Sequence, residues 1–389
     1  MTGMNMTTYN DSSCSTGIKP PSFRSEDIVV MCMLSVFSVI GTIGNGLVIY
    51  VYFQKRDKLT SNLFIMALAI TDFITSLLIM PYTVVFIYIQ DEVLFDPFCK
   101  LYHFLITSNV PLSAFLMVSI AVDRYLCICH PFLQLLTVPR AKMILLIQLI
   151  FAATLGLITA LMYSVYQLPS EIKDLPIWSG VNTSVSFEHC ESIYTGLCSP
   201  TTLLFMEDFP LYYQKVYSSF FLISLLLVFT LYIMIYKFVT SRRAKRQKQK
   251  NAKQFSTIMV QTEHSQIQTN EQQHSTKVEV NQNGVCTTLL PPNADCNDEH
   301  SKQKRKSTRD RRDHNALANI KTAIMLFVVA VVFIIAFLPA WLMALDAVTY
   351  VQTVFYSYFI YNVVNPIIYA FMNQTFRTDL QKVFGPCFS

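Results

Sequence analysis

The chain has 389 residues, of which 52% are hydrophobic and only 14% are charged, with a formal net charge of +5. An ordinary soluble protein carries about 25% charged residues. This balance excludes a soluble or disordered chain, and it makes the lipid bilayer the expected solvent for most of the residues.

Seven apolar blocks follow one another along the chain. A helix of about 25 residues spans the ~30 Å hydrocarbon layer at ~1.5 Å per residue, whereas a membrane barrel needs short segments of alternating polarity. Helices also pair their backbone polar groups within one segment. We therefore predict an all-α membrane protein, a seven-transmembrane helix bundle with a short amphipathic eighth helix. The blocks cover residues 28–53, 62–88, 98–129, 141–165, 211–240, 317–345 and 350–373.

Lys and Arg in the connecting segments set the expected orientation. They gather after the first block, before the fourth and in a dense run after the fifth, and such loops face the cytoplasm. The N-terminus is then extracellular and the expected location is the plasma membrane. The predicted organisation is an extracellular tail (1–27), helices one to five (28–240), a flexible basic third cytoplasmic loop (241–316), helices six and seven (317–373), and an amphipathic helix with the cytoplasmic tail (374–389).

Modification signals lie on both faces of the expected bundle. Three sequons on the outside predict glycosylation of Asn5, Asn10 and Asn182. Cys387 follows the amphipathic segment and is a palmitoylation candidate, with a free thiol as the alternative. The basic ends of the inner loop, 242–253 and 302–312, predict contact with anionic membrane lipids, or else a membrane-flanking role alone.

Four cysteines, Cys14, Cys99, Cys190 and Cys198, fall on the expected outer side, where disulfides form. Four cysteines allow three pairings, and the sequence alone does not choose between them. We favour Cys99 with Cys198, because Cys198 is closer to the fifth block, which leaves Cys190 to join Cys14. The pairing of Cys99 with Cys190 remains the alternative. Either bond would hold the second outer loop over the mouth of the bundle.

Polar side chains inside the blocks are costly in lipid, so they indicate function. The clearest is Asp72, near the middle of the second block. Oxygen-bearing side chains of this kind suit a hard cation such as Na⁺, and a water-filled hydrogen-bonded cluster that joins the helices is the alternative. The other blocks bring five polar residues to comparable depth: Asn45, Asn109, Ser113, Asn362 and Asn365.

The inner end of the third block and two prolines have the pattern of a switch. The third block ends in Asp123-Arg124-Tyr125, where the acid can hold the arginine until a partner competes for it. Pro339 in the sixth block and Pro366 in the last each free a backbone carbonyl and allow the helix to bend. Their polar and aromatic neighbours are Phe333, Phe337, Trp341, Asn365 and Tyr369.

Together these residues resemble the rhodopsin-like (class A) G-protein-coupled receptors, from about residue 28 to about residue 384. The resemblance implies an agonist that enters from outside and a sixth helix that swings outward on the inside. It further implies that Arg124, Tyr232 and Tyr369 rearrange to admit a G-protein α subunit. It also implies that the Asp72 cluster is a sodium site with Ser113 and Asn365 as further ligands. The matching residues are Gly44-Asn45, Leu68-Ala69, Asp72, Cys99, Asp123-Arg124-Tyr125, Phe333, Phe337-Leu338-Pro339, Asn365-Pro366 and Tyr369.

The chain departs from the family pattern around the sixth helix. Ala114 replaces the bulky aliphatic residue that packs against Phe333, and Phe337 stands where tryptophan is commoner. Asn319 stands where many members carry an acid that locks Arg124. We therefore expect altered central packing and, as a hypothesis, signalling without ligand.

The outer halves of the helices indicate the ligand class. Ile106 stands where amine receptors of this family carry an aspartate for the ligand ammonium, so a biogenic amine is the disfavoured alternative. The outer segments carry 13 acidic and 5 basic residues, which favours a basic neuropeptide. The expected ligand pocket is an aromatic cleft formed by Tyr82, Phe86, Tyr102, His103, Ile106, Tyr213, Tyr217, Trp341, Phe355 and Phe359.

Other classes fit the sequence less well. Its seven histidines show no metal-ligand spacing, and it has no phosphate-binding glycine loop or nucleophile elbow, so we expect neither an enzyme nor a resident cofactor beyond the sodium ion. A membrane transporter is the remote alternative, but no internal repeat supports it. The expected partners are an extracellular peptide, a heterotrimeric G protein, membrane lipids, receptor kinases and arrestin, and no nucleic acid.

Overall fold

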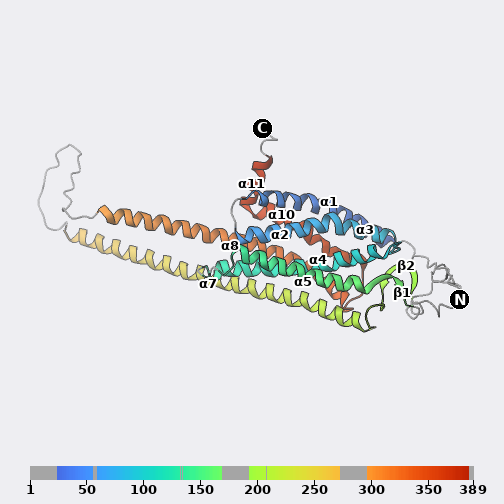
Figure 1. Ribbon diagram of the computed structural model, residues 1–389. Coiled ribbons are helices and arrows are strands. Elements are labelled where there is room, and N and C mark those ends of the chain that lie inside the picture. The colour runs from blue at the N-terminus through green and yellow to red at the C-terminus, as the bar shows by residue number, and fades with distance from the viewer. Residues whose placement is uncertain are drawn as a thin grey trace, which may run out of the picture. The chain divides into compact units, whose positions relative to one another are not determined.

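The computed structural model describes residues 24–55, 59–131, 133, 135–168, 192–206, 208–271 and 296–384 (Figure 1). For residues 256–271 and 296–319 it describes the backbone alone. The described chain forms two compact units: one holds the residues up to Tyr232 and from Lys321 onward, and the other is Ile233–Ile320.

Seven helical segments of the described chain are long and apolar enough to cross a membrane. This confirms the predicted helical membrane class, because the lipid-facing surface keeps many large apolar side chains exposed while the polar ones lie inside. The seven segments are Ser25–Phe53, Thr60–Tyr88, Asp96–Cys129, Val138–Met162, Phe209–Gln249, Ile320–Ala344 and Gln352–Met372.

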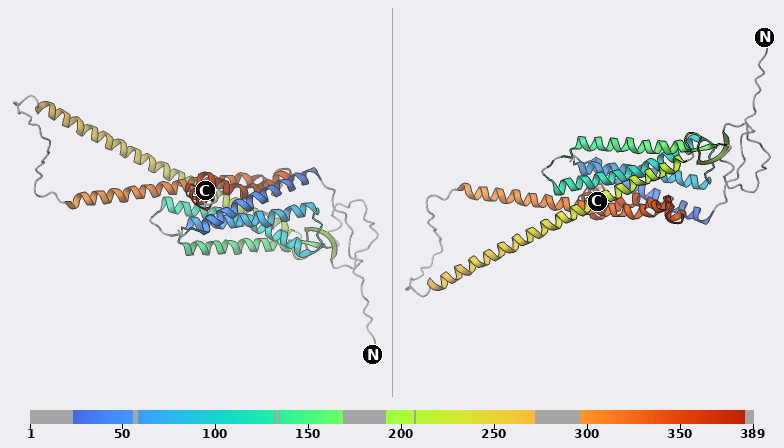
Figure 2. Two further views of the ribbon diagram at one scale, coloured as in Figure 1. Left: turned by 90° about the horizontal axis from the view of Figure 1, so that it is seen from above. Right: turned by 90° about the horizontal axis from the view of Figure 1, so that it is seen from below.

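Helices α1 (Ser25–Phe53), α4 (Asp96–Cys129) and α5 (Val138–Met162) are single elements, and α4 and α5 run along one another (Figure 2). Glycines permit the closest approaches. A Cβ atom added at Gly156 of α5 would lie 2.7 Å from the carbonyl oxygen of Phe104 in α4. In α1, a Cβ atom at Gly41 would lie 2.2 Å from Oγ of Ser76. Glycine at these two positions therefore permits close contacts that any larger residue would prevent.

The second span contains a one-turn irregularity. It consists of α2 (Thr60–Ile74), the π-helical turn η2 (Thr75–Ile79) and α3 (Met80–Tyr88). The backbone N–H of Met80 donates to the carbonyl of Thr75, five residues back rather than four. Pro81 follows at the start of α3, and it has no N–H for the carbonyl four residues before it, so the wider turn absorbs the lost bond.

A β-hairpin absent from our sequence prediction follows α5. Strand β1 (Tyr163–Gln167) pairs antiparallel with β2 (Ile193–Pro200), with an irregularity in register after Ser164. Glu92, in the loop before α4, forms a bridge to Leu197 and extends this small sheet. The hairpin therefore joins the segment between α5 and α7 to the loop before α4.

The segment that we predicted as a flexible third cytoplasmic loop (241–316) is helical at both of its described ends. Helix α7 (Phe209–Glu271) continues far beyond the expected end at residue 240, and α8 (Cys296–Ala344) begins well before residue 317. Residues 241–271 contain no glycine or proline and are rich in Lys, Arg and Gln, which favour helix. Low hydrophobicity excludes a buried core there, but it does not exclude a solvated helix.

The last span consists of α9 (Gln352–Tyr356), η3 (Ser357–Phe359) and α10 (Ile360–Met372), and α11 (Gln374–Phe384) follows it. In α11, Phe376 is buried against the ring of Tyr52, and Asp379 pairs with Lys55 at 3.3 Å. Side-chain contacts therefore hold the amphipathic helix against the end of α1. In the unit that holds the residues up to Tyr232 and from Lys321 onward, the largest buried side chains include Phe64, Tyr361 and Tyr369. The core of this unit therefore lies between α2 and α10.

Candidate functional site

A polar cluster lies in the middle of the bundle, where α1, α2 and α10 meet. Nδ2 of Asn365 donates to Oδ2 of Asp72 at 2.7 Å, and both residues are buried. Nδ2 of Asn45 donates to the backbone oxygen of Asn362 at 2.8 Å. The two asparagine contacts join distant parts of the chain, so the cluster fixes the relative position of the first, second and last spans.

Where the polar cluster meets α4, it includes Tyr361, a residue that our sequence analysis did not predict. The hydroxyl groups of Ser113 and Tyr361 are 2.7 Å apart, and Oγ1 of Thr75 donates to Oδ1 of Asn109 at 2.9 Å. Tyr361 precedes the predicted Asn362 by one position. As one of 20 tyrosines in the chain, it carried no signal that its hydroxyl would join a polar cluster.

These contacts test whether the cluster fits the sodium ion implied by the resemblance. Ser113, Asn109 and one oxygen of Asp72 are already bonded within the protein. Among the described residues, the buried oxygens that lack a partner include Oδ1 of Asp72, Asn45 and Asn362. The implied ligand set of Asp72, Ser113 and Asn365 therefore does not fit a sodium ion as these side chains lie.

An aromatic cluster adjoins the polar one. The ring centroids of Phe333 and Phe337 in α8 are 4.6 Å apart, and Tyr361 contacts both, at 5.4 Å and 5.0 Å. Phe221 of α7, another residue that we did not single out, packs against Phe333 at 5.9 Å. Nε1 of Trp341 donates to the backbone oxygen of Ser218 in α7. The third, fifth, sixth and seventh spans thus meet at Phe333, Phe337 and Tyr361.

Near the C-terminal end of α4, Arg124 is held by its neighbour Asp123. Asp123 forms an ion pair with Arg124, and both side chains are buried. The hydroxyl of Thr60 at the start of α2 donates to Asp123, and Arg124 donates to the hydroxyl of Ser61. Tyr125 points elsewhere, since its hydroxyl is 3.2 Å from Nε2 of His130.

Two further residues predicted for the switch have hydroxyls without a partner in the described structure. They are Tyr232 of α7 and Tyr369 of α10, and both are buried. Tyr232 packs on the ring of Phe327 at 5.1 Å. Unpaired buried hydroxyls are costly, so these two are available to new hydrogen-bond partners when the surrounding helices move. The side chain of Asn319 lies outside the described residues.

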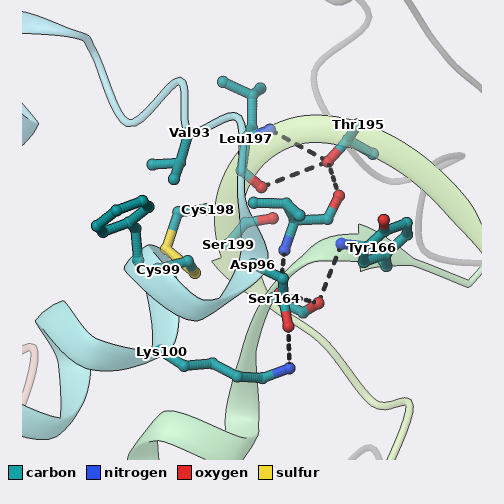
Figure 3. Close-up of a disulfide and its surroundings, with 12 residues drawn as sticks. Val93, Asp96, Cys99, Lys100, Ser164, Tyr166, Thr195, Leu197, Cys198 and Ser199 are labelled. Carbon is teal, nitrogen blue, oxygen red and sulfur yellow. Dashed lines mark hydrogen bonds and ion pairs between the residues drawn. A yellow bond between two sulfur atoms is a disulfide. The ribbon is translucent and has the colours of Figure 1, made fainter.

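Near the N-terminal end of α4, a disulfide joins Cys99 of α4 to Cys198 of β2 (Figure 3). Asp96, one turn before Cys99, accepts hydrogen bonds from Oγ of Ser164 at 2.7 Å and from the backbone N–H of Val165 at 3.0 Å. Lys100 pairs with the same carboxylate. The favoured pairing of Cys99 is the one present, while Cys14, Cys190, Cys387 and the predicted glycosylation residues Asn5, Asn10 and Asn182 lie outside the described residues.

The disulfide forms part of an apolar cluster beneath the hairpin. Tyr102 stacks on Phe86 with ring centroids 4.0 Å apart, and His103 stacks on Tyr163 of β1 at 3.5 Å. Tyr82 and Ile106 pack against the same cluster. Five residues of the predicted aromatic cleft are therefore brought together here.

The remaining residues of the predicted cleft have contacts of their own. Tyr213 and Tyr217 of α7 donate to backbone oxygens of α5 and α4, at 2.6 Å and 3.0 Å. Phe355 packs on Tyr350, and Phe359 is fully buried against Tyr358. The predicted cleft residues thus occur in the cluster at the hairpin, along α7 and among the rings of the last span.

Acidic side chains lie at the hairpin end of the bundle. Asp27, in the first turn of α1, accepts hydrogen bonds from the backbone N–H of Arg24 and from Nε2 of Gln90. The pKa of Asp91 rises from 3.8 to about 6, because burial disfavours its charge and Asp27 repels it. The backbone oxygen of Asp91 accepts from the N–H of Cys198 at 2.9 Å, which ties the backbone at Asp91 to the disulfide-bonded Cys198.

Seven spans, a buried Asp-Arg pair at one end and a disulfide-anchored hairpin at the other define a multi-pass membrane receptor. Residues 44–369 match the family model of the seven-transmembrane receptors of the rhodopsin family. The chain therefore belongs to that family.

Curated relatives agree with this assignment. The chain is 23% identical to cholecystokinin receptor type A of Cavia porcellus, in a match that covers 94% of this chain and 83% of that receptor. It is 28% identical to galanin receptor 2a of Danio rerio over 47% of this chain and 51% of that receptor. It is 37% identical to formyl peptide receptor-related sequence 6 of Mus musculus over 27% of this chain and 31% of that protein. The last two matches span about half or less of the relatives' length.

Proposed function

We propose that this receptor binds an extracellular peptide that contains a basic residue, and that the bound receptor activates a heterotrimeric G protein. The observation that carries the ligand class is the surroundings of Ile106. This residue packs against the apolar cluster of Phe86, Val93, Cys99, Tyr102 and Val165, and its own side chain carries no charge. A small amine placed there would bury its ammonium without a counter-ion.

The acidic end of the bundle supports a basic ligand. Asp91 and Glu92 lie in the loop beside the hairpin, and Asp27 lies close to Asp91. Carboxylates at a mouth attract cationic ligands over a distance of about one Debye length. The relatives named above include receptors for cholecystokinin, galanin and formyl peptides, which supports a peptide in particular.

In this proposal the N-terminus and the hairpin face outward, and the Asp123–Arg124 pair faces the cytoplasm. Ligand binding moves the sixth span, and Arg124 leaves Asp123 for the free hydroxyls of Tyr232 and Tyr369. The opened inner surface then admits the G protein. Receptor kinases and arrestin act on the same surface afterwards, and anionic lipids contact the basic inner segments.

A ligand screen tests the proposal. Cells that express the chain are exposed to a panel of neuropeptides and biogenic amines, and calcium and cyclic nucleotides are measured. We expect a basic peptide agonist whose potency falls several-fold with Asp91→Asn and Glu92→Gln together, because the attracting charge is lost. Asp208→Asn, which removes an exposed carboxylate before α7, is the matched control and should change potency less. A potent amine agonist would contradict the peptide class.

Purified receptor in lipid vesicles gives the second measurement. The agonist should speed GDP release from a G protein, and Arg124→Ala should abolish this effect. Release that stays at the basal rate with every agonist active in cells would contradict the proposed coupling.

A further inference from the structure

We propose that the hydroxyl of Tyr361 takes the place of the sodium ion in this receptor, so that a side chain of the protein, rather than a dissolved cation, joins the polar cluster to the aromatic cluster. Tyr361 is fully buried at the start of α10. Its hydroxyl is 2.7 Å from Oγ of Ser113, and the side chains of Asn109 and Asn362 lie close to the same group. The hydroxyl is thus surrounded by oxygen-bearing side chains that would otherwise serve a hard cation.

The bonds already formed leave little for an ion on this side. Asn109 uses Oδ1 to accept the hydroxyl of Thr75, and Asp72 uses Oδ2 to accept the amide of Asn365. A sodium ion on Ser113 would have to displace the phenol, and the ring cannot withdraw because Phe333 and Phe337 pack against it. Close packing therefore makes the phenol a permanent occupant.

The acceptors without a partner belong to residues other than Ser113. Among the described residues of the polar cluster they are Oδ1 of Asp72, Asn45 and Asn362, from the first, second and last spans, together with the hydroxyl of Ser76 in the second span. Acceptors of this kind in a buried polar space are satisfied by bound water. Water bound to these atoms leaves Ser113 bonded to Tyr361.

Tyr361 is also a positioning residue. Its hydroxyl is fixed on α4 and its ring lies on two residues of α8, so a movement of the sixth span must either carry the ring away or break the bond to Ser113. The strength of that bond then sets how readily the bundle leaves its resting arrangement, without any dependence on external sodium.

Thermal unfolding of the purified receptor without ligand tests the proposal, and it requires neither a known agonist nor a G protein. The melting temperature is measured in NaCl, KCl and choline chloride at matched ionic strength, because a ligand that binds only the folded state raises it. We expect equal values for the wild type in all three salts. Tyr361→Asn opens the position, so we expect it to gain a saturable increase in NaCl alone, and Ser113→Ala in the same chain should remove that gain.

Tyr358→Asn is the matched control. The Tyr358 ring also stacks on Phe337, at 4.8 Å, while the hydroxyl that Ser113 contacts belongs to Tyr361, so this variant should lose stability equally in every salt. A sodium-specific increase in the wild type would overturn the proposal, and so would the absence of any sodium effect in Tyr361→Asn. If that variant does not fold, Ser113→Ala alone decides: an equal loss in all salts supports the bond to Tyr361, and a loss confined to NaCl overturns it.

Discussion

The contact between α4 and α5 at Gly156 allows a stability prediction that follows directly from geometry. A Cβ atom at this position would lie 2.7 Å from the carbonyl oxygen of Phe104 and 2.8 Å from Cβ of Ser108. Both distances are well below van der Waals contact, and the carbonyl belongs to a helix backbone that cannot rotate away. Gly156→Ala must therefore push two long helices apart.

Overpacking of this kind costs about 1–3 kcal/mol. Alanine is favoured over glycine in a helix by about 1 kcal/mol, so the net loss is up to about 2 kcal/mol. For a folded unit of this size, 1 kcal/mol shifts the melting temperature by about 2–4 °C. We therefore expect Gly156→Ala to melt up to about 8 °C below the wild type.

The assay is thermal unfolding in detergent at one fixed scan rate, so that irreversible steps affect all variants alike. Gly46→Ala is the control, because a Cβ atom there would meet only Cε2 of Phe73, at 3.5 Å. That variant should keep or raise the melting temperature. The reasoning is refuted if Gly156→Ala melts at or above the wild type while Gly46→Ala melts below it.

The further predictions concern three acidic residues. Because the folded pKa of Asp91 is raised from 3.8 to about 6, its charge opposes folding above about pH 6, and stability should rise as the pH falls through 6 toward 4. A basic agonist should lose affinity over the same range in a binding assay, because the carboxylate becomes neutral. Asp96→Ala removes the acceptor for Ser164 and Val165, so hydrogen exchange at the Val165 amide should accelerate. Asp123→Asn removes the charge that holds Arg124, and basal GDP release should increase in a nucleotide-exchange assay.

Each of these predictions has its own control. Asp91→Asn should abolish the pH effect on stability below pH 6, and a variant that retains it would place the titrating group elsewhere. For the hairpin, Asp96→Asn keeps an acceptor oxygen and should exchange more slowly than Asp96→Ala. For the ion pair, an Asp123→Asn receptor with wild-type basal release would show that Ser61 alone is enough to hold Arg124.

Hydropathy was sufficient to predict the seven spans, because the cost of polar groups in lipid acts on each segment separately. The polar cluster around Asp72 was also predictable for the same reason. The role of Tyr361 was not, since its partner Ser113 is 248 positions away and a tyrosine in an apolar block is ordinary in composition. Contacts between distant segments are decided by the packing of whole helices, which local patterns do not record.

The helices beyond the membrane show a second kind of difference. Residues 241–271 were predicted to be flexible from their low hydrophobicity, which measures the ability to form a core. Helix formation needs only backbone bonds and suitable residues, so propensity and the absence of glycine and proline were the relevant signals. The hairpin was hidden by a short strand of mixed polarity, β1, directly after an apolar helix.

The π-helical turn at Thr75–Ile79 inserts one residue into an otherwise regular span. One residue corresponds to about 100° of rotation around a helix axis. The turn therefore changes the direction in which Tyr82 and Phe86 face the cluster under the hairpin, relative to the part of the span that holds Asp72. A single insertion or deletion near Pro81 could re-aim the half of this span next to the hairpin and leave the half that holds Asp72 unaltered, which offers a simple route by which the hairpin end of the bundle diverges while the polar cluster is retained.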